Sequence, residues 1–178
     1  GYSKYVWSSE NYTRDNHFGL YQSNATIEVY HEDGRIASGY EQDGWDWNRL
    51  PGTTGIHLPL ERLESPRSGT LMRRSNETFA GTAVMDGEIG IFGFILNEDY
   101  FGNDLKARKS VIMLPDYLIA LGSGIESSNT DYPTETTLFQ ASLDSPDVPQ
   151  QFSFRSNPVT GLDQAGNQTG STGIWLQD

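Results

Sequence analysis

Apolar and polar residues alternate over short stretches early in the chain, and this period of two is typical of half-buried β-strands. The alternation is clearest within residues 20–30, and a shorter strand is expected over 2–7. Residues 32–35, Glu-Asp-Gly-Arg, provide a hairpin turn, because Asp-Gly tolerates the positive φ angles of a type I′ turn. We therefore expect a return strand over 35–40.

Two further hairpins are predicted in the middle of the chain. The first joins 77–84 to 88–96 over Met85-Asp86-Gly87, and the second joins 106–114 to 116–121. The other expected elements are an apolar run over 56–60 that Pro59 places at a strand end or edge, an exposed loop over 62–75, a strand end at 122–124, and strands over 134–140, 151–154 and 173–176.

No stretch shows the 3.6-residue period of a long amphipathic helix, whereas 19 glycines and 8 prolines supply frequent turns. Short strands joined by turn residues indicate an all-β fold, built as an antiparallel β-sandwich. A chain of 178 residues is long enough to bury one sizeable core. We therefore interpret residues 1–178 as a single β-sandwich domain.

The charge balance is strongly acidic and narrows the set of partners. Twelve Lys and Arg residues stand against 24 Asp and Glu residues, so the formal net charge is −12. Such a charge disfavours nucleic acid and anionic membrane surfaces as partners. The absence of cysteine excludes disulfides and thiol chemistry. No apolar run approaches the roughly 18 residues of a membrane-spanning helix.

Residues 45–54, Trp-Asp-Trp-Asn-Arg-Leu-Pro-Gly-Thr-Thr, concentrate the most distinctive side chains of the chain, and we call them the signature segment. Pro51-Gly52 predicts a tight turn, because proline fixes φ and glycine supplies a positive φ. Asp46 is placed to hold Arg49 by a charge-assisted hydrogen bond.

The two tryptophans of the signature segment have two possible roles. Trp45 and Trp47 are two positions apart, so both indoles point the same way if the segment is extended. One role is a structural corner in which Trp47 is largely buried and Asp46 or Asn48 bonds the backbone at the following turn. The other is an exposed indole that forms a platform for a sugar ring.

Residues that could hold a metal are sparse. The three histidines have no carboxylate or second histidine at metal-ligand spacing, so we interpret them as surface or loop residues. Two pairs of acids offer oxygen ligands for Ca²⁺, although solvated turn acids are the commoner explanation. We expect no cofactor, with Ca²⁺ as the alternative. The histidines are His17, His31 and His57, and the acid pairs are Asp86 with Glu88 and Glu98 with Asp99.

The signature segment, read from Asp46 to Thr54, resembles a motif of the central β domain of polysaccharide lyase family 8, which contains the chondroitin, hyaluronate and xanthan lyases. Further blocks resemble the family in the same order, from about residue 2 to about residue 140. Residues 56–61 and 132–137 narrow the resemblance to the chondroitin sulfate ABC lyases. The other blocks are Phe79-Ala80-Gly81-Thr82 with Asp86-Gly87, Ala107-Arg108-Lys109-Ser110, and Leu121 to Ile125.

The resemblance implies that this chain is part of a two-sheet supersandwich within a larger bacterial lyase, periplasmic or secreted, with an α-helical toroid domain upstream. It implies β-elimination, in which the C5 proton of a uronic acid is removed while its carboxylate is neutralised. The implied substrates are chondroitin and dermatan sulfate, with hyaluronan as a further candidate. Because this chain is acidic, most positive charge at the cleft must then come from elsewhere.

The resemblance also implies a division of the catalytic residues between the two domains. The toroid supplies a Tyr, a His and an Arg, and the β domain supplies one Glu that positions the Arg and Tyr. Glu10 fits that place best, with Asp15 as its competitor and Glu135 as a third candidate. Trp47, Asn48 and Arg49 are expected to be substrate-adjacent or structural. The alternative function is a non-catalytic carbohydrate-binding or structural domain, because sandwiches host many functions.

Overall fold

The structure is a computed structural model, and the chain divides into two compact units that are described separately below. The larger unit comprises residues 4–28 and 46–139, and the smaller comprises 1–3, 29–45 and 140–178. The structure describes residues 2–6, 11–13, 16–34, 38–64, 70–72, 77–98, 104–138, 140–141, 151–154, 157–160 and 174–177.

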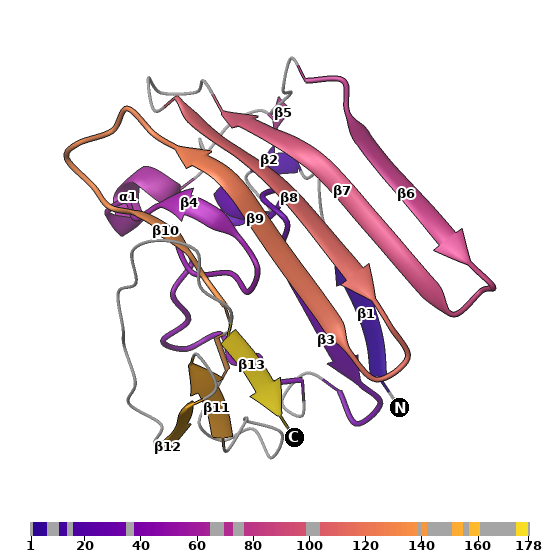
Figure 1. Cartoon of the computed structure of the whole chain (residues 1–178). Coiled ribbons are helices and arrows are strands. Elements are labelled where there is room, and N and C mark those ends of the chain that lie inside the picture. Colours follow the sequence, from indigo (N-terminus) through magenta and orange to yellow (C-terminus); the bar gives the residue numbers. More distant parts are fainter. Residues whose placement is uncertain are drawn as a thin grey trace. The chain divides into compact units, whose positions relative to one another are not determined.

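The larger unit is built on a four-stranded antiparallel sheet in the order β6-β7-β8-β9 (Figure 1). Its strands are β6 (Ala80–Met85), β7 (Ile89–Glu98), β8 (Leu105–Met113) and β9 (Leu118–Glu126). The two predicted hairpins, β6–β7 and β8–β9, are confirmed. The turn between β6 and β7 has positive φ at two successive residues, Asp86 and Gly87, which is the geometry of a type I′ turn.

One face of this sheet forms part of the buried core of the larger unit. Leu105, Ala107 and Val111 of β8 are 0–2 % exposed and Lys109 is 7 % exposed, whereas the alternating residues Lys106, Arg108 and Ser110 face the other way. Phe94 and Leu96 of β7, which pair with Lys109 and Ala107, are also buried on this face. The strict alternation along β8 is the period of two expected for a strand.

The signature segment leads into short elements that complete this unit. They are the 3₁₀ turn η1 (Gly19–Tyr21), β4 (Thr54–Ile56), α1 (Leu60–Leu63) and β10 (Thr134–Thr136), with β4 and β10 paired antiparallel. Tyr21 is 1 % exposed, and its hydroxyl donates to the Ile56 carbonyl at 2.6 Å and accepts from the Ile56 amide at 3.2 Å. These bonds fix η1 against β4.

The remaining strands form three small sheets. β1 (Tyr2–Val6) pairs with β3 (Ile27–His31), and β2 (Asn11–Thr13) pairs with β5 (Thr70–Met72). In the smaller unit β11 (Gln151–Phe154) lies between β12 (Asn157–Thr160) and β13 (Ile174–Gln177). The all-β class and its antiparallel pairing are therefore confirmed. None of the helices among the described residues is long and apolar enough to cross a membrane.

The strand expected over residues 20–30 is wrong in its first half. This stretch forms η1 and a turn before β3 begins at Ile27. Ala25 has a φ of 71°, in the left-handed region, where a strand cannot continue. Tyr21 and Asn24 are both buried, and Asn24 donates to the Thr54 carbonyl at 2.9 Å. Their packing against β4 outweighs the alternating pattern of this stretch.

Other boundaries also differ from the expectation. Gly34 has a φ of 100° and forms a bridge with His31, but Ser38 and Gly39 lie in a turn rather than a return strand, and 35–37 lie outside the described residues. β9 continues past its expected end, because Gly124 adopts a φ of 57° at an irregularity in the β8–β9 pairing. β5 lies within the expected loop over 62–75, and β12 was not predicted.

Candidate functional site

The predicted turn of the signature segment is present and closely packed. The Thr53 amide donates to the Leu50 carbonyl at 3.1 Å, and Gly52 has a φ of 82° at the third position of that turn. The Gly52 amide donates to the Thr137 carbonyl at 2.9 Å, and the Thr137 amide donates to the Thr53 carbonyl at 2.9 Å. The turn is therefore joined by two bonds to the residue that follows β10.

The tryptophans differ from the expectation, because the segment is not extended between them. The Arg49 amide donates to the Asp46 carbonyl at 2.9 Å, which closes a turn over 46–49. Trp47 stacks on Phe18, with ring centroids 5.6 Å apart and planes inclined by 23°, whereas Trp45 lies 5.0 Å from Tyr40. Trp47 is half-buried rather than largely buried, so the structural-corner interpretation holds only in part.

Asn48 anchors the signature segment to the chain that leads from β4 to α1. Its side-chain amide donates to the Leu58 carbonyl at 2.9 Å, and its side-chain carbonyl accepts from the Leu58 amide at 2.9 Å. Asp46 accepts from the Asn48 amide at 3.0 Å. Of the two residues expected to bond the Pro51-Gly52 turn, Asp46 or Asn48, Asn48 does not, because both ends of its side-chain amide bond one residue ten positions away.

Arg49 is the centre of an ionic cluster that the structure assembles from distant parts of the larger unit. Its Nε and Nη2 donate to the two oxygens of Glu135 at 3.1 and 3.3 Å, a bidentate pair. Its Nη1 lies 3.2 Å from Asp46 Oδ2, which confirms the predicted Asp46–Arg49 pair. His57 Nδ1 lies 3.0 Å from Glu135 Oε2. We call Asp46, Arg49, His57 and Glu135 the arginine clamp.

The contacts within the arginine clamp shift the pKa values of Glu135 and Arg49. Burial alone would raise the pKa of Glu135, but the hydrogen bonds from Arg49 and His57 outweigh it and hold that pKa below its ordinary value. The hydrogen bond to Glu135 raises the pKa of Arg49. Because each guanidinium nitrogen already contacts a carboxylate oxygen, Arg49 is suited to fixing the segment rather than to neutralising a substrate carboxylate.

Replacing Glu135 with Gln should lower the free energy of unfolding by about 1–2 kcal/mol at pH 7, because the bidentate pair and the bond to His57 are lost. A carboxylate whose pKa is lowered by folding stabilises the protein above its ordinary pKa. The difference between wild type and variant should therefore disappear as the pH falls through the lowered value. Urea unfolding at pH 7 and at successively lower pH measures it, with the exposed Glu88→Gln as control. An equal loss in both variants would contradict the clamp.

Lys109 of β8 links the four-stranded sheet to the signature segment by two hydrogen bonds. Its side chain is buried, and Nζ donates to the Gly52 carbonyl at 3.0 Å and to the Thr54 hydroxyl at 2.8 Å. That hydroxyl in turn lies 2.9 Å from the Thr136 hydroxyl, so β8, β4 and β10 share one chain of hydrogen bonds. Burial lowers the pKa of Lys109 to about 8.

The buried Lys109 predicts an alkaline change in stability. Between pH 8 and the ordinary lysine pKa, the unfolded chain binds a proton that the folded protein has lost, so stability rises with pH. Relative to Lys109→Met, the wild-type free energy of unfolding should rise by up to about 3 kcal/mol across this window and stay level below it. Lys106→Met, at an exposed position on the same strand, keeps Lys109 and should show the same rise as wild type. Parallel pH profiles for all three proteins would contradict the prediction.

The candidate catalytic acids are only partly described. Glu10 and Asp15 lie outside the described residues, and Glu135 belongs to the arginine clamp. The sequence did not predict that Glu135 and His57 belong to the arginine clamp. Both residues lie inside the blocks that resemble the chondroitin ABC lyases, and this position is the sequence feature that could have indicated them. His17, another of the three histidines, lies outside the arginine clamp, with its Nδ1 3.5 Å from Glu64 Oε1.

The acids proposed for Ca²⁺ do not form a cluster where they are described. Asp86 and Glu88 are exposed in the β6–β7 turn, Glu98 is 6 % exposed, and Asp99 lies outside the described residues. Within the part of the chain that the structure describes, no three His, Asp or Glu residues are grouped so that they could hold a metal ion.

Comparison with known proteins agrees with the fold. The profile of the super-sandwich domain of polysaccharide lyase family 8 matches residues 1–177. The chondroitin sulfate ABC endolyase of Proteus vulgaris is 42 % identical over 146 residues, which are 80 % of this chain and 14 % of that protein. The chondroitin sulfate ABC exolyase of Bacteroides thetaiotaomicron is 38 % identical over 156 residues, or 80 % and 15 % of the two chains. This chain therefore spans about one seventh of the length of these relatives.

A solved structure shares the fold at lower sequence identity. The xanthan lyase of Paenibacillus superimposes with a TM-score of 0.62 and 23 % identity, covering 98 % of this chain and 16 % of that one. At this identity the likeness concerns the fold alone.

Proposed function

Because this chain belongs to polysaccharide lyase family 8 and matches its super-sandwich domain over residues 1–177, we propose that it is the β domain of a lyase that cleaves chondroitin and dermatan sulfate. The observation that carries the proposal is the 42 % identity to a protein named chondroitin sulfate ABC endolyase. Hyaluronan is a further candidate substrate, and the relatives include both an endolyase and an exolyase.

The proposed reaction is β-elimination at the uronic acid. A base removes the C5 proton, the electron pair forms the C4–C5 double bond, and the C4–oxygen bond to the neighbouring sugar breaks as that oxygen is protonated. The negative charge that develops on the uronate during this step needs neutralisation by a cation. We assign the base and the cation to an α-helical toroid domain of the same polypeptide, and to this chain the acid that positions them, Glu10.

The role we propose for the described part of the site is structural support. The bonds of Arg49 to Glu135 and of Asn48 to Leu58 tie the signature segment to β10 and to the chain that leads from β4 to α1, and His57 also holds Glu135. Catalytic groups must be kept close to their productive geometry, and supporting hydrogen bonds provide that rigidity. In this scheme Trp47 and Arg49 stabilise the β-domain wall of the cleft without contacting the substrate.

The proposed setting of the enzyme follows from its substrate and relatives. Glycosaminoglycan polymers lie outside cells, and the relatives described above come from bacteria, which favours a periplasmic or secreted lyase. Because this chain has a net charge of −12, attraction of the polyanionic substrate must come from cations elsewhere in the enzyme.

The proposal is tested by incubating the full-length polypeptide with chondroitin sulfate, dermatan sulfate and hyaluronan and following the ultraviolet absorbance of the unsaturated uronate. Absorbance should rise with at least the first two polymers, whereas dextran, which has no uronate, should give none. Cleavage that produces new reducing ends without the absorbance would indicate hydrolysis and contradict the proposal. Binding without cleavage would favour a carbohydrate-binding domain instead.

A further inference from the structure

The two candidate acids of this chain stand close together in the sequence, on either side of β2. Glu10 directly precedes β2, and Asp15 directly precedes a turn over 16–19. We call residues 10–15 the acid stretch. Its described attachment is the antiparallel pairing of β2 with β5. After the turn the chain becomes fixed at η1, where Tyr21 is buried and bonded to β4. The turn over 16–19 therefore connects the acid stretch to the core of the larger unit.

Two side chains of this turn contact other segments of the larger unit. His17 Nδ1 lies 3.5 Å from Glu64 Oε1, but these side chains are 38 % and 40 % exposed. An exposed ion pair is screened by water and salt and holds its side chains weakly. Phe18 stacks on Trp47, with ring centroids 5.6 Å apart and planes inclined by 23°. We call Phe18 and Trp47 the aromatic pair. Because stacked rings constrain both distance and orientation, the aromatic pair is the firmer of the two contacts.

Trp47 is itself firmly held, because hydrogen bonds fix the backbone around it. The Arg49 amide closes a turn with the Asp46 carbonyl at 2.9 Å, and the side chains of both residues belong to the arginine clamp. The adjacent Asn48 is bonded to the chain that leads from β4 to α1. The indole therefore offers Phe18 a fixed surface, three positions downstream of the acid stretch.

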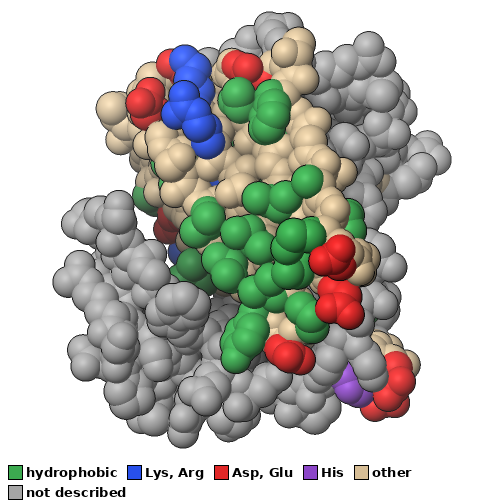
Figure 2. Space-filling view, turned by 45° about the vertical axis from the view of Figure 1, so that its right-hand side comes forward, with side chains coloured by type: hydrophobic (Ala, Val, Ile, Leu, Met, Phe, Trp, Pro, Cys, Tyr) green, Lys and Arg blue, Asp and Glu red, His purple; other side chains and the backbone are tan. Residues whose placement is uncertain are grey.

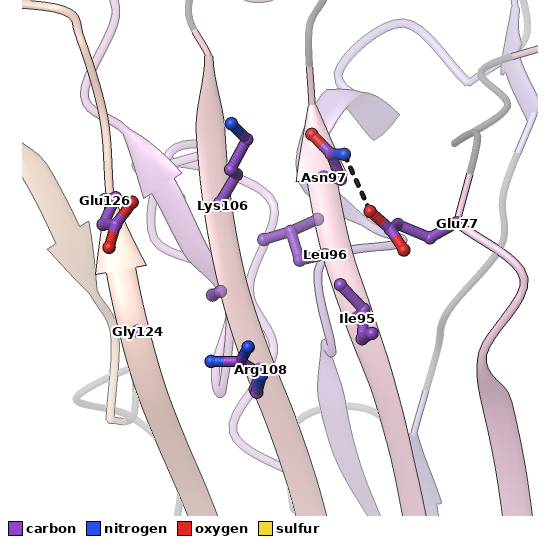
Figure 3. A pocket seen from close by; sticks show the side chains of 9 residues that line it. Glu77, Ile95, Leu96, Asn97, Lys106, Arg108, Gly124 and Glu126 are labelled. Carbon is purple, nitrogen blue, oxygen red and sulfur yellow. Dashed lines mark hydrogen bonds between the residues drawn. The ribbon is translucent and has the colours of Figure 1, made fainter.

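Two other surface features of the larger unit do not provide this connection. Figure 2 shows hydrophobic side chains gathered on one face of the molecule, and exposed apolar residues such as Ile91 belong to the four-stranded sheet. A polar hollow is lined by residues of β7, β8 and β9 together with Glu77 (Figure 3). The described residues that line this hollow include none from the turn over 16–19 or from the signature segment. The link between these two segments is therefore the aromatic pair.

We propose that Trp47 is a positioning residue for the elimination reaction. Through Phe18 it fixes the turn over 16–19, and thereby holds the acid stretch where its carboxylate meets the proton-transferring groups. This inference rests on the proposed function, because it requires that the acid stretch carries the positioning acid. A displacement of about 1 Å at a catalytic group can cost on the order of 10²-fold in rate. Trp47 acts in this way without contacting the substrate, so its loss should change kcat rather than KM.

The test is the steady-state kinetics of the full-length polypeptide on chondroitin sulfate, followed by the absorbance of the unsaturated uronate. In Trp47→Ala we expect kcat to fall by about tenfold or more while KM stays within about twofold. Trp47→Phe keeps a ring against Phe18 and should retain most of the wild-type rate. Phe18→Leu removes the other ring and repeats the measurement if Trp47→Ala folds poorly. The control is Trp45→Ala, whose indole lies against Tyr40 and which should keep the wild-type kcat.

A double variant separates positioning of the acid from general support of the fold. When Trp47→Ala is added to the acid variant that removes most of the rate, Glu10→Gln or Asp15→Asn, kcat should fall by less than about twofold further, because the acid through which Trp47 acts is already lost. An undiminished loss in that background would overturn the proposal, and so would equal losses in Trp47→Ala and Trp45→Ala.

The kinetic constants also distinguish this role from direct contact with the substrate. A raised KM with an unchanged kcat in Trp47→Ala would make the indole a sugar platform and contradict the positioning role. An inactive wild-type polypeptide would remove the proposed function, and this inference with it. An active wild type with a silent Trp47→Ala would contradict the positioning role alone.

Discussion

Replacing Glu10 with Gln in the full-length polypeptide should lower kcat on the order of 10²-fold or more, which is a typical cost of removing a positioned acid or base. The substitution keeps the shape of the side chain and removes its charge. In the proposed reaction that charge holds the toroid's arginine and sets the proton affinity of its tyrosine. The measurement is the rate of formation of unsaturated uronate at saturating substrate.

The matched control is Asp15→Asn, the competing acid of the same segment. If Glu10 is the positioning residue, Asp15→Asn should retain most of the rate, and both variants should unfold at the wild-type urea concentration. A silent Glu10→Gln with an inactive Asp15→Asn would move the role to Asp15. If both variants keep the wild-type rate, the acid of the β domain lies elsewhere and the assignment is wrong.

Gly52→Ala should destabilise the protein by about 3 kcal/mol or more, the largest stability effect expected in the signature segment. Gly52 has a φ of 82°, where an L-residue is strained by about 1–2 kcal/mol. A Cβ built there would also lie 2.7 Å from the Ala25 carbonyl oxygen and 2.7 Å from Ile27 Cγ1. Because a backbone atom cannot retreat as a side chain can, the turn or β3 must shift.

Gly87→Ala separates the conformational strain at positive φ from the steric clash of the added Cβ. Gly87 has a similar φ of 73°, but a Cβ built there meets nothing within 4 Å. It should therefore cost only the conformational strain, about 1–2 kcal/mol. Urea unfolding of both variants gives the comparison, and equal losses would show that the close packing at Gly52 contributes nothing.

The parts of the fold that could be predicted from sequence are those decided by neighbouring residues. The β6–β7 hairpin follows from the Asp86-Gly87 turn between two apolar stretches, and both residues adopt the positive φ that such a turn requires. The same holds for Pro51-Gly52. The strand predicted over residues 20–30 was wrong in its first half, because the burial of Tyr21 against β4 depends on a segment 35 positions away.

In the candidate site, too, the contacts that could be predicted from sequence are those between residues close together in the chain. The Asp46–Arg49 pair is separated by three positions and was expected from the motif. The partners of Arg49 and Asn48 were not, since Glu135 is 86 positions from Arg49 and Leu58 is ten positions from Asn48. The burial of Lys109 was not predicted, because its acceptors Gly52 and Thr54 lie 57 and 55 positions away in the chain.

The central claim is that residues 1–178 provide one wall and one acid of a lyase site whose proton-transferring groups lie in another part of the same polypeptide. The most direct measurement compares the full-length polypeptide with residues 1–178 alone, at equal concentration on chondroitin sulfate, by the absorbance of the unsaturated uronate. We predict that absorbance rises with the full-length polypeptide and stays at the level of the buffer with residues 1–178. Clear turnover by residues 1–178, or none by the full-length polypeptide, would contradict the account.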